Sequence, residues 1–222
     1  MASTSALSVQ KNFKYDVFLS FRGEDTRKTF VDHLYVALVS KGIITYKDDE
    51  KIEKGERIGE QLNRSIQDSR FHIIVFSKNY ASSSWCLDEL VKIIECQKMK
   101  EHTAYPVFYD VEPTEVRHQS GAFGEAFAKL VAKHENSSWM FSFFELFARK
   151  KMSEDVDQEK EEDVKRWRYA LNEAAGLAGM ELKNTFNGYS SLLFLYSLCL
   201  IWTSVSSRGG PTLLMAAHLD FF

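Results

Sequence analysis

The feature that most constrains the fold of this chain is an alternation of short apolar runs with longer segments of helical periodicity. The apolar runs cover residues 15–21, 43–46, 71–77 and 105–109, and a further short one follows at 179–182. Short runs rich in aromatic and branched side chains are typical of strands buried on both faces. Because strands that alternate with helices are joined by right-handed crossovers, the sequence predicts an α/β fold around a parallel sheet.

The segments between the runs predict helices and loops in turn. From Thr29 the apolar residues recur at helical spacing, and Gly42 stands where a left-handed residue ends a helix. The segments 21–25, 47–57, 77–84 and 110–121 are predicted as loops that follow the strands. Loops that follow parallel strands share the carboxyl edge of the sheet, where α/β proteins bind ligands.

Composition sets the size of the molecule and narrows its partners. With 222 residues, 45% of them hydrophobic, the chain can bury one core and is expected to form one domain with extensions. A net charge of -3 gives no general attraction to nucleic acid or to an anionic membrane, so neither is expected as a partner. The cysteines Cys86, Cys96 and Cys199 are odd in number and show no Cys-x-x-Cys spacing, which predicts a reducing compartment.

Several kinds of catalytic site are absent from the sequence. No predicted strand is followed by a Gly-rich phosphate-binding motif, and no Gly-x-Ser-x-Gly occurs. The six histidines fall at no metal-ligand spacing, so no metal site is expected. A phospho-receiver domain has acidic residues at the ends of its first and third strands, whereas those ends here read Ser20-Phe21-Arg22 and Ser77-Lys78-Asn79.

The stretch from Ser82 to Leu90 is the strongest candidate for a reactive site. Ser83 or Ser84 can cap a helix that begins near Trp85. Four residues apart on that helix, Trp85 and Glu89 share a face, so the indole can cover one side of the carboxylate. In the alternative interpretation Trp85 belongs to the core and Glu89 is a solvated acid, which is the commoner case for an isolated pair of this kind.

The same stretches resemble a known family. Residues 16–27 (DVFLSFRGEDTR), 42–46 (GIITY), 77–90 (SKNYASSSWCLDEL) and 106–113 (PVFYDVEP) look like the TIR domain of plant immune receptors. The resemblance covers about residues 13–189. It implies a flavodoxin-like, doubly wound parallel sheet of five strands.

The resemblance also implies an activity. TIR domains of this kind cleave the nicotinamide–ribose bond of NAD+ or NADP+ when they self-associate, and Glu89 matches their catalytic glutamate. Phe21, Arg22 and Gly23 match the part of the pocket that faces the nucleotide, and Trp85 and Cys86 flank the glutamate. No cofactor is expected, because the dinucleotide is the substrate.

The expected partners are NAD+, further copies of this chain through TIR–TIR contacts, and other TIR-type immune receptors. The expected location is the cytoplasm, with the nucleus as a second compartment. The alternative function is a non-catalytic module that signals in disease resistance through TIR–TIR contact alone.

The sequence departs from the family pattern in several places. Asp32-His33 replaces a Ser-His pair on a self-association surface, so that contact is expected to weaken or to pair the acid with a cation. The loop that the family uses to contact the next subunit carries Ile52 and Lys54 in place of leucine and arginine. A charged insertion occupies about residues 136–162. No nucleotide-binding domain or leucine-rich repeat follows, so a TIR-only or truncated chain is expected.

The two ends of the chain are expected to lie outside the domain. Residues 1–12 are polar and are predicted to be a disordered tail. Residues 190–222 form a divergent apolar tail whose stretch 192–202 is too short to span a bilayer. A packed last helix, an interfacial segment and an aberrant C-terminus are the three interpretations of that tail.

Overall fold

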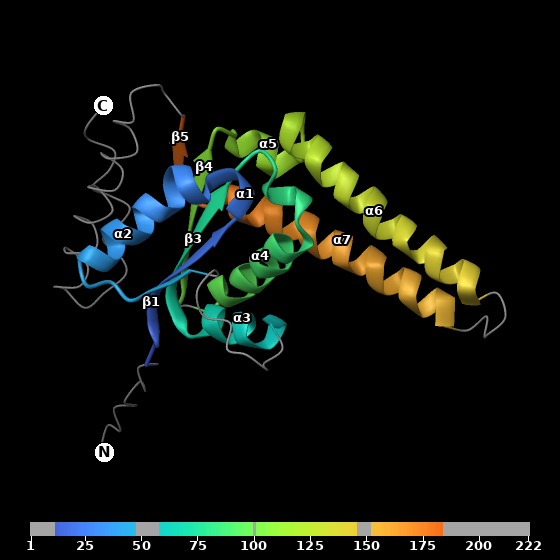
Figure 1. Cartoon of the computed structure of the whole chain (residues 1–222), viewed down its shortest axis with the longest axis horizontal. Coiled ribbons are helices and arrows are strands. Elements are labelled where there is room, and N and C mark those ends of the chain that lie inside the picture. The colour runs from blue at the N-terminus through green and yellow to red at the C-terminus, as the bar shows by residue number, and fades with distance from the viewer. Residues whose placement is uncertain (1–11, 48–57, 100, 146–151, 184–222) are drawn as a thin grey trace, which may run out of the picture.

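The computed structural model describes residues 12–47, 58–99, 101–145 and 152–183, and five parallel strands form one sheet at its centre (Figure 1). The strands are β1 (Tyr15–Phe21), β2 (Thr45–Lys47), β3 (Ser69–Phe76), β4 (Thr103–Tyr109) and β5 (Met180–Leu182). Their spatial order is β2-β1-β3-β4-β5, and every neighbouring pair is parallel. This is the flavodoxin-like order, so the predicted fold is confirmed, and the order reverses between β1 and β3.

Helices follow the strands in the predicted alternation, with two differences in detail. The helical segments are α1 (Gly23–Thr26), a π-helical turn η1 (Arg27–Val31), α2 (Asp32–Ser40), α3 (Ile58–Gln67), a 3-10 turn η2 (Tyr80–Ser82), α4 (Ser84–Gln97), α5 (Pro113–His118), α6 (Gly121–Glu145) and α7 (Met152–Gly176). The first helical segment thus begins at Gly23 and not at Thr29. Pro113 at the first helical position and a reciprocal cap between Glu112 and Glu115 make a short helix of part of the predicted loop 110–121.

The helices cover both faces of the sheet, and each face has its own core. Along β1, Val17, Leu19 and Phe21 pack on the face covered by η1 and α2. Phe18 faces the opposite way, into a larger core shared with α3, α4 and α7. This alternation follows from the two-residue period of a strand, and it places Ser20 on the same face as Phe18. Figure 1 shows α2 on one side of the sheet and α3 and α4 on the other.

Gly42 lies just after α2 and stops the helix, as predicted. Its φ of 76° is in the left-handed region, and its N–H donates to the carbonyl of Val39 at 2.9 Å. Ile43 N–H then donates to the carbonyl of Leu38 at 3.1 Å, so the chain turns directly into β2. A glycine adopts this conformation without the steric cost of a Cβ.

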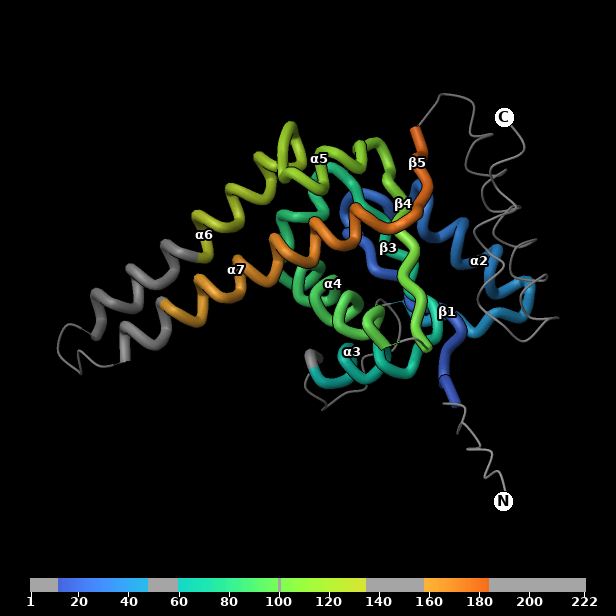
Figure 2. Tube along the Cα trace, turned by 180° about the vertical axis from the view of Figure 1, so that it is seen from behind, coloured from blue at the N-terminus to red at the C-terminus, as the bar shows by residue number. Residues whose placement is uncertain are grey.

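Helices α6 and α7 lie side by side and lead away from the sheet, as Figures 1 and 2 both show. His134 on α6 contacts Asp163 and the ring of Trp167 on α7. The charged insertion at 136–162 falls on the far ends of these helices and on residues 146–151, which lie outside the described residues.

The predicted N-terminal tail, apart from its last residue, and the whole apolar tail also lie outside the described residues, as do Ile52 and Lys54. In the part of the chain that the structure describes, no helix is long and apolar enough to cross a membrane.

Candidate active site at the carboxyl ends of β1 and β3

Helix α4 places Glu89 next to the end of β1, where the strand order of the sheet reverses. The helix begins at Ser84, and the Ser83 side chain caps it by accepting a hydrogen bond from Cys86 N–H at 3.4 Å. The predicted cap is therefore Ser83. Ligands of open α/β sheets bind at the point where the strand order reverses, so Glu89 lies where this fold places a binding site.

The Glu89 side chain is buried. Only 6% of the residue is exposed, and its Oε2 accepts a hydrogen bond from the Ser20 hydroxyl at 2.8 Å. Ser20 itself is fully buried near the end of β1. A carboxylate removed from water needs such partners, because the loss of hydration otherwise costs several kcal/mol.

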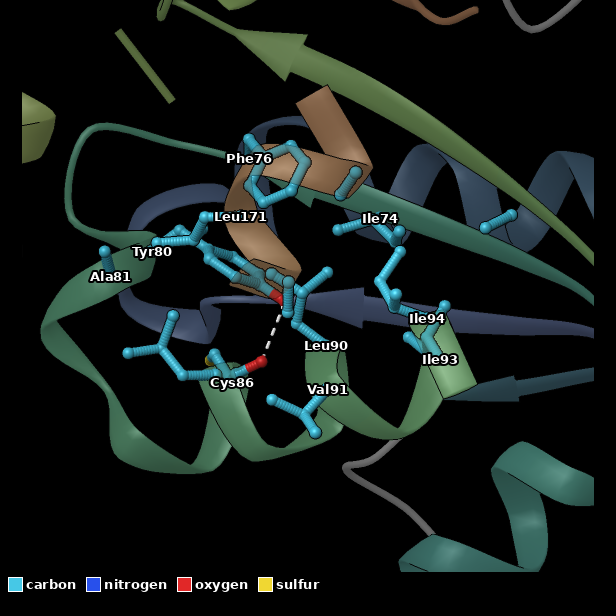
Figure 3. Close-up of a cluster of buried hydrophobic side chains, with 14 of the residues drawn as sticks. Ile74, Phe76, Tyr80, Ala81, Cys86, Leu90, Val91, Ile93, Ile94 and Leu171 are labelled. Carbon is cyan, nitrogen blue, oxygen red and sulfur yellow. Dashed lines mark hydrogen bonds between the residues drawn. The ribbon is translucent and has the colours of Figure 1, made fainter. Parts of the chain in front are cut away.

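Tyr80 completes a chain of hydrogen bonds with these two residues. Its hydroxyl lies 2.9 Å from Ser20 Oγ and donates to the carbonyl oxygen of Cys86, also at 2.9 Å. Figure 3 shows the second contact as a dashed line among buried apolar side chains. Burial raises the pKa of Tyr80 well above its usual value, and the titratable groups of Cys86 and Glu89 nearby act in the same direction. The hydroxyl therefore keeps its proton at neutral pH.

Trp85 lies in the first turn of α4 and is 56% exposed. The covering of Glu89 by its indole stays a prediction. The alternative interpretation is wrong for both residues, because Trp85 is outside the core and Glu89 is not solvated. The Ser20 hydroxyl lies against the carboxylate, and the Tyr80 hydroxyl lies behind Ser20.

Cys86 contacts the backbone of Phe21 and not its ring. The Cys86 thiol donates to the carbonyl oxygen of Phe21 at 3.7 Å, so the end of β1 contacts the first turn of α4. The Phe21 ring packs on the other face of the sheet, and the guanidinium of Arg27 lies 5.6 Å from its centroid. The structure thus brings Cys86 and Glu89 together and directs the Phe21 side chain away from them.

Arg22 and Gly23 form the turn that follows β1. Arg22 pairs with Glu24 at 2.5 Å and lies 3.9 Å from Asp25. Its buried Nε has no hydrogen-bond partner among the residues that the structure describes. A Cβ at position 23 would lie 2.3 Å from the Arg27 guanidinium, so glycine lets that side chain fold back over the turn.

Asp25 ties this turn to the loop after β3. Its carboxylate accepts hydrogen bonds from the Ser77 hydroxyl at 2.6 Å, from the Asn79 backbone N–H at 3.1 Å and from the Asn79 amide at 3.3 Å. Two loops that lie more than 50 residues apart in the sequence are thereby fixed to each other at the edge of the site.

Three residues of this site were not singled out by the sequence analysis: Ser20, Asp25 and Tyr80. The signal for Ser20 was present, since it is a polar residue inside an otherwise apolar run. Asp25 and Tyr80 gave no such signal, because each sits in a polar or mixed segment where a side chain of its type is common.

The same edge of the sheet also contains a hollow of about 470 Å³ between the ends of β4 and β5 and helix α5. Lys78, Asp110, Glu112 and Glu181 are among its lining residues, and Glu89 is not. Its mixed charge does not favour a phosphate group. Within the described ranges, no three His, Cys, Asp or Glu side chains lie close enough together to hold a metal ion.

Curated proteins similar to this chain are plant disease-resistance proteins. The chain is 49% identical to TMV resistance protein N of Nicotiana glutinosa over 179 residues and 46% identical to disease resistance protein RPV1 of Vitis rotundifolia over 181 residues. The matches cover 81% and 82% of this chain. They span only 13% and 11% of those relatives' lengths.

A solved structure and a family model agree with these relatives. The TIR domains in the structure titled "activated Roq1 resistosome directly recognizing the pathogen effector XopQ" align with a TM-score of 0.64 and 44% identity, covering 83% of this chain and 99% of that one. The TIR domain model matches residues 14–161. The chain therefore belongs to the TIR domain family, with plant disease-resistance proteins among its relatives.

Proposed function

We propose that this chain is an enzyme that hydrolyses the nicotinamide–ribose bond of NAD+ or NADP+, with Glu89 as its catalytic residue. The observation that carries the proposal is the placement of the Glu89 carboxylate, which is buried beside the end of β1 and oriented by Ser20. A buried carboxylate costs stability, so its presence at a ligand-binding edge favours a role in chemistry over one in folding.

The reaction requires only one carboxylate. The bond from the ribose anomeric carbon to the pyridinium nitrogen breaks, and its electron pair neutralises the positive charge of the departing ring. No general acid is needed. Glu89 stabilises the cationic ribose and accepts the proton of the water that adds to it. Partial exclusion of water strengthens the attraction between the carboxylate and the developing cation.

The other predicted site residues suit the binding of a dinucleotide. Arg22 places a partly exposed guanidinium at the end of β1, where it can pair with a phosphate group. The exposed indole of Trp85 offers a surface on which an aromatic ring can stack. Gly23 begins α1 directly after Arg22, and Cys86 follows Trp85 in the first turn of α4.

We further propose that TIR–TIR association activates the enzyme in plant innate immunity, in the cytoplasm or nucleus, and that its nucleotide products act as signals. The solved Roq1 TIR domains belong to an activated resistosome, which supports association as the active state. The alternative is a module that signals by TIR–TIR contact without catalysis. It predicts that Glu89 is irrelevant to signalling.

The test is nicotinamide release per mole of purified chain across a wide dilution series, with either NAD+ or NADP+. Activity should rise steeply with protein concentration. Glu89→Gln keeps the size of the side chain and an oxygen for Ser20, and should lower the turnover about 100-fold to 1,000-fold. Glu95→Gln, which alters an exposed acid on the same helix, is the control and should leave turnover unchanged. Equal turnover in Glu89→Gln and wild type would refute the catalytic assignment.

A further inference from the structure

Four buried oxygen atoms form a continuous chain beneath the candidate site. The chain runs from the Cys86 carbonyl to Tyr80 Oη, then to Ser20 Oγ and to Glu89 Oε2, with separations of 2.9, 2.9 and 2.8 Å. Ser20 and Tyr80 are both fully buried. Both hydroxyls are therefore held in fixed positions by the packing around them.

Neither hydroxyl is needed to fill space in the core. Ser20 lies on the same strand face as Phe18, and the neighbouring residue on β3 is the apolar Ile74. The Tyr80 ring packs edge-on against Phe76 at 5.0 Å, a contact that a phenylalanine would also make. A buried hydroxyl in an apolar setting costs free energy unless it is bonded, so these two are best explained by what they bond to.

We propose that Ser20 and Tyr80 are positioning residues that hold the Glu89 carboxylate in its reactive orientation. This inference rests on the proposed function. Ser20 fixes Oε2, which fixes the plane of the carboxylate and the direction of Oε1. Tyr80 links Ser20 on β1 to the Cys86 carbonyl on α4, three residues before Glu89. These hydrogen bonds thereby fix the distance between the end of β1 and the start of α4.

The protons of the two hydroxyls allow Glu89 to be hydrogen-bonded both as a carboxylate and as a neutral acid. While Glu89 is a carboxylate, Ser20 donates to it, and the Tyr80 proton has a choice of two acceptors at 2.9 Å, Ser20 and the Cys86 carbonyl. When Glu89 takes up a proton, it can donate to Ser20, Ser20 to Tyr80, and Tyr80 to the carbonyl. Each of the three contacts then contains a proton, and no heavy atom has to move.

This property suits the step in which water adds to the ribose. The water oxygen forms a bond to the anomeric carbon, and its proton passes to the Glu89 carboxylate. Ser20 reverses its donor direction as that proton arrives, while Tyr80 goes on donating to the Cys86 carbonyl, so Glu89 stays bonded before and after the transfer. Such preorganisation lowers the barrier because the surroundings need little rearrangement.

The test uses Ser20→Ala and Tyr80→Phe in the full chain. Each variant removes one hydroxyl, and each should lower kcat about 10-fold to 100-fold while KM for NAD+ stays within about twofold. The double variant should be little worse than either single variant, since the hydroxyls act as one unit. The control is Ser69→Ala, which removes a fully buried serine hydroxyl bonded at 2.7 Å to the Ser65 carbonyl at the opposite end of the sheet. It should lower thermal stability without changing kcat.

The outcomes separate this inference from the proposed function. If wild type releases nicotinamide and Glu89→Gln does not, while Ser20→Ala and Tyr80→Phe keep the wild-type kcat, the positioning role is overturned and the catalytic role stands. If wild type releases none, the proposed function fails. A double-mutant cycle of Ser20→Ala with Glu89→Gln, measured by denaturant unfolding, then decides whether Ser20 orients the Glu89 side chain. Coupling supports the orienting contact, and additive effects overturn it.

Discussion

Removing the carboxylate of Asp32 should destabilise the protein, because Asp32 pairs with a buried lysine. Lys47 Nζ lies 2.8 Å from Asp32 Oδ1, and the side chains are 8% and 44% exposed respectively. The ammonium group also lies 4.9 Å from the centre of the Tyr35 ring. Where the family resemblance places a serine on a self-association surface, this chain has Asp32, and the expectation that the acid weakens that contact or pairs with a cation across it stays a prediction; within the chain Asp32 pairs with Lys47.

The expected size of the effect follows from this uneven burial. Breaking a fully buried ion pair from one side costs about 3–5 kcal/mol, and an exposed pair contributes less than about 1 kcal/mol. Here the cation is buried and the anion is half-exposed, so Asp32→Ala should cost about 1–3 kcal/mol. In a domain of this size, about 2 kcal/mol corresponds to a fall of about 4–8 °C in the unfolding midpoint.

The assay is thermal unfolding followed by circular dichroism, with a matched control and a cycle. Lys47→Met removes the buried charge and leaves Asp32 in contact with water, so it should cost less than Asp32→Ala. Adding Lys47→Met to Asp32→Ala should restore part of the lost stability. The control is Glu161→Ala, since Glu161 pairs with Lys165 at the same 2.8 Å but both side chains are about two-thirds exposed. It should leave the midpoint unchanged.

Two results would refute this reasoning. If Asp32→Ala and Glu161→Ala lowered the midpoint equally, burial of the cation would not set the cost. If Lys47→Met were the more damaging change, the ammonium group would stabilise the fold through more than its pair with Asp32, for example through its contact with the Tyr35 ring.

Three further predictions concern other parts of the structure. Asp25→Ala breaks the link to Asn79 and should lower both turnover and the unfolding midpoint, whereas an unchanged turnover would show that the two loops need no such link. Partial burial raises the pKa of Asp88 above its ordinary 3.8, while a hydrogen bond from Trp167 opposes the shift, so the folded state binds this proton more tightly than the unfolded chain. The stability that Asp88 contributes is therefore full below the unfolded pKa and is lost as pH rises through the folded pKa. Asp88→Asn should raise the thermal unfolding midpoint slightly at pH 7 and leave it unchanged at pH 3. A lower midpoint at pH 7 would contradict the argument. Gly42→Ala should lower the free energy of unfolding by about 1–2 kcal/mol through the positive φ alone, because no atom lies within 4 Å of the new Cβ. An unchanged free energy of unfolding in urea would contradict this strain.

The location of the site was predictable because it follows from topology. Short apolar runs separated by helical segments leave few arrangements other than a parallel sheet, and such sheets bind ligands at their carboxyl edge. Ser83 as a helix cap and Gly42 as a helix end are local features, and both agree with the structure. The short helix at Pro113–His118 was missed, because its proline and polar residues also fit a loop.

The burial of Glu89 could not be predicted from its spacing to Trp85. Helical periodicity shows that the two residues share a face, but not how far along the helix the sheet extends. Trp85 lies in the first turn of α4 and is exposed, whereas Glu89 lies one turn further and is covered by β1.

The sequence by itself determined the strands, the parallel sheet, the family resemblance and the choice of Glu89 as the candidate acid, since all of these depend on local periodicity or on contiguous motifs. Only the tertiary structure decided which side chains hold that acid. The contacts of Ser20 with Tyr80 and with Glu89 join residues 60 and 69 positions apart, and Asp25 contacts Ser77 across 52 positions. Such pairs form because folding brings the ends of β1 and β3 together, and a hydroxyl or carboxylate has no local pattern that names its distant partner.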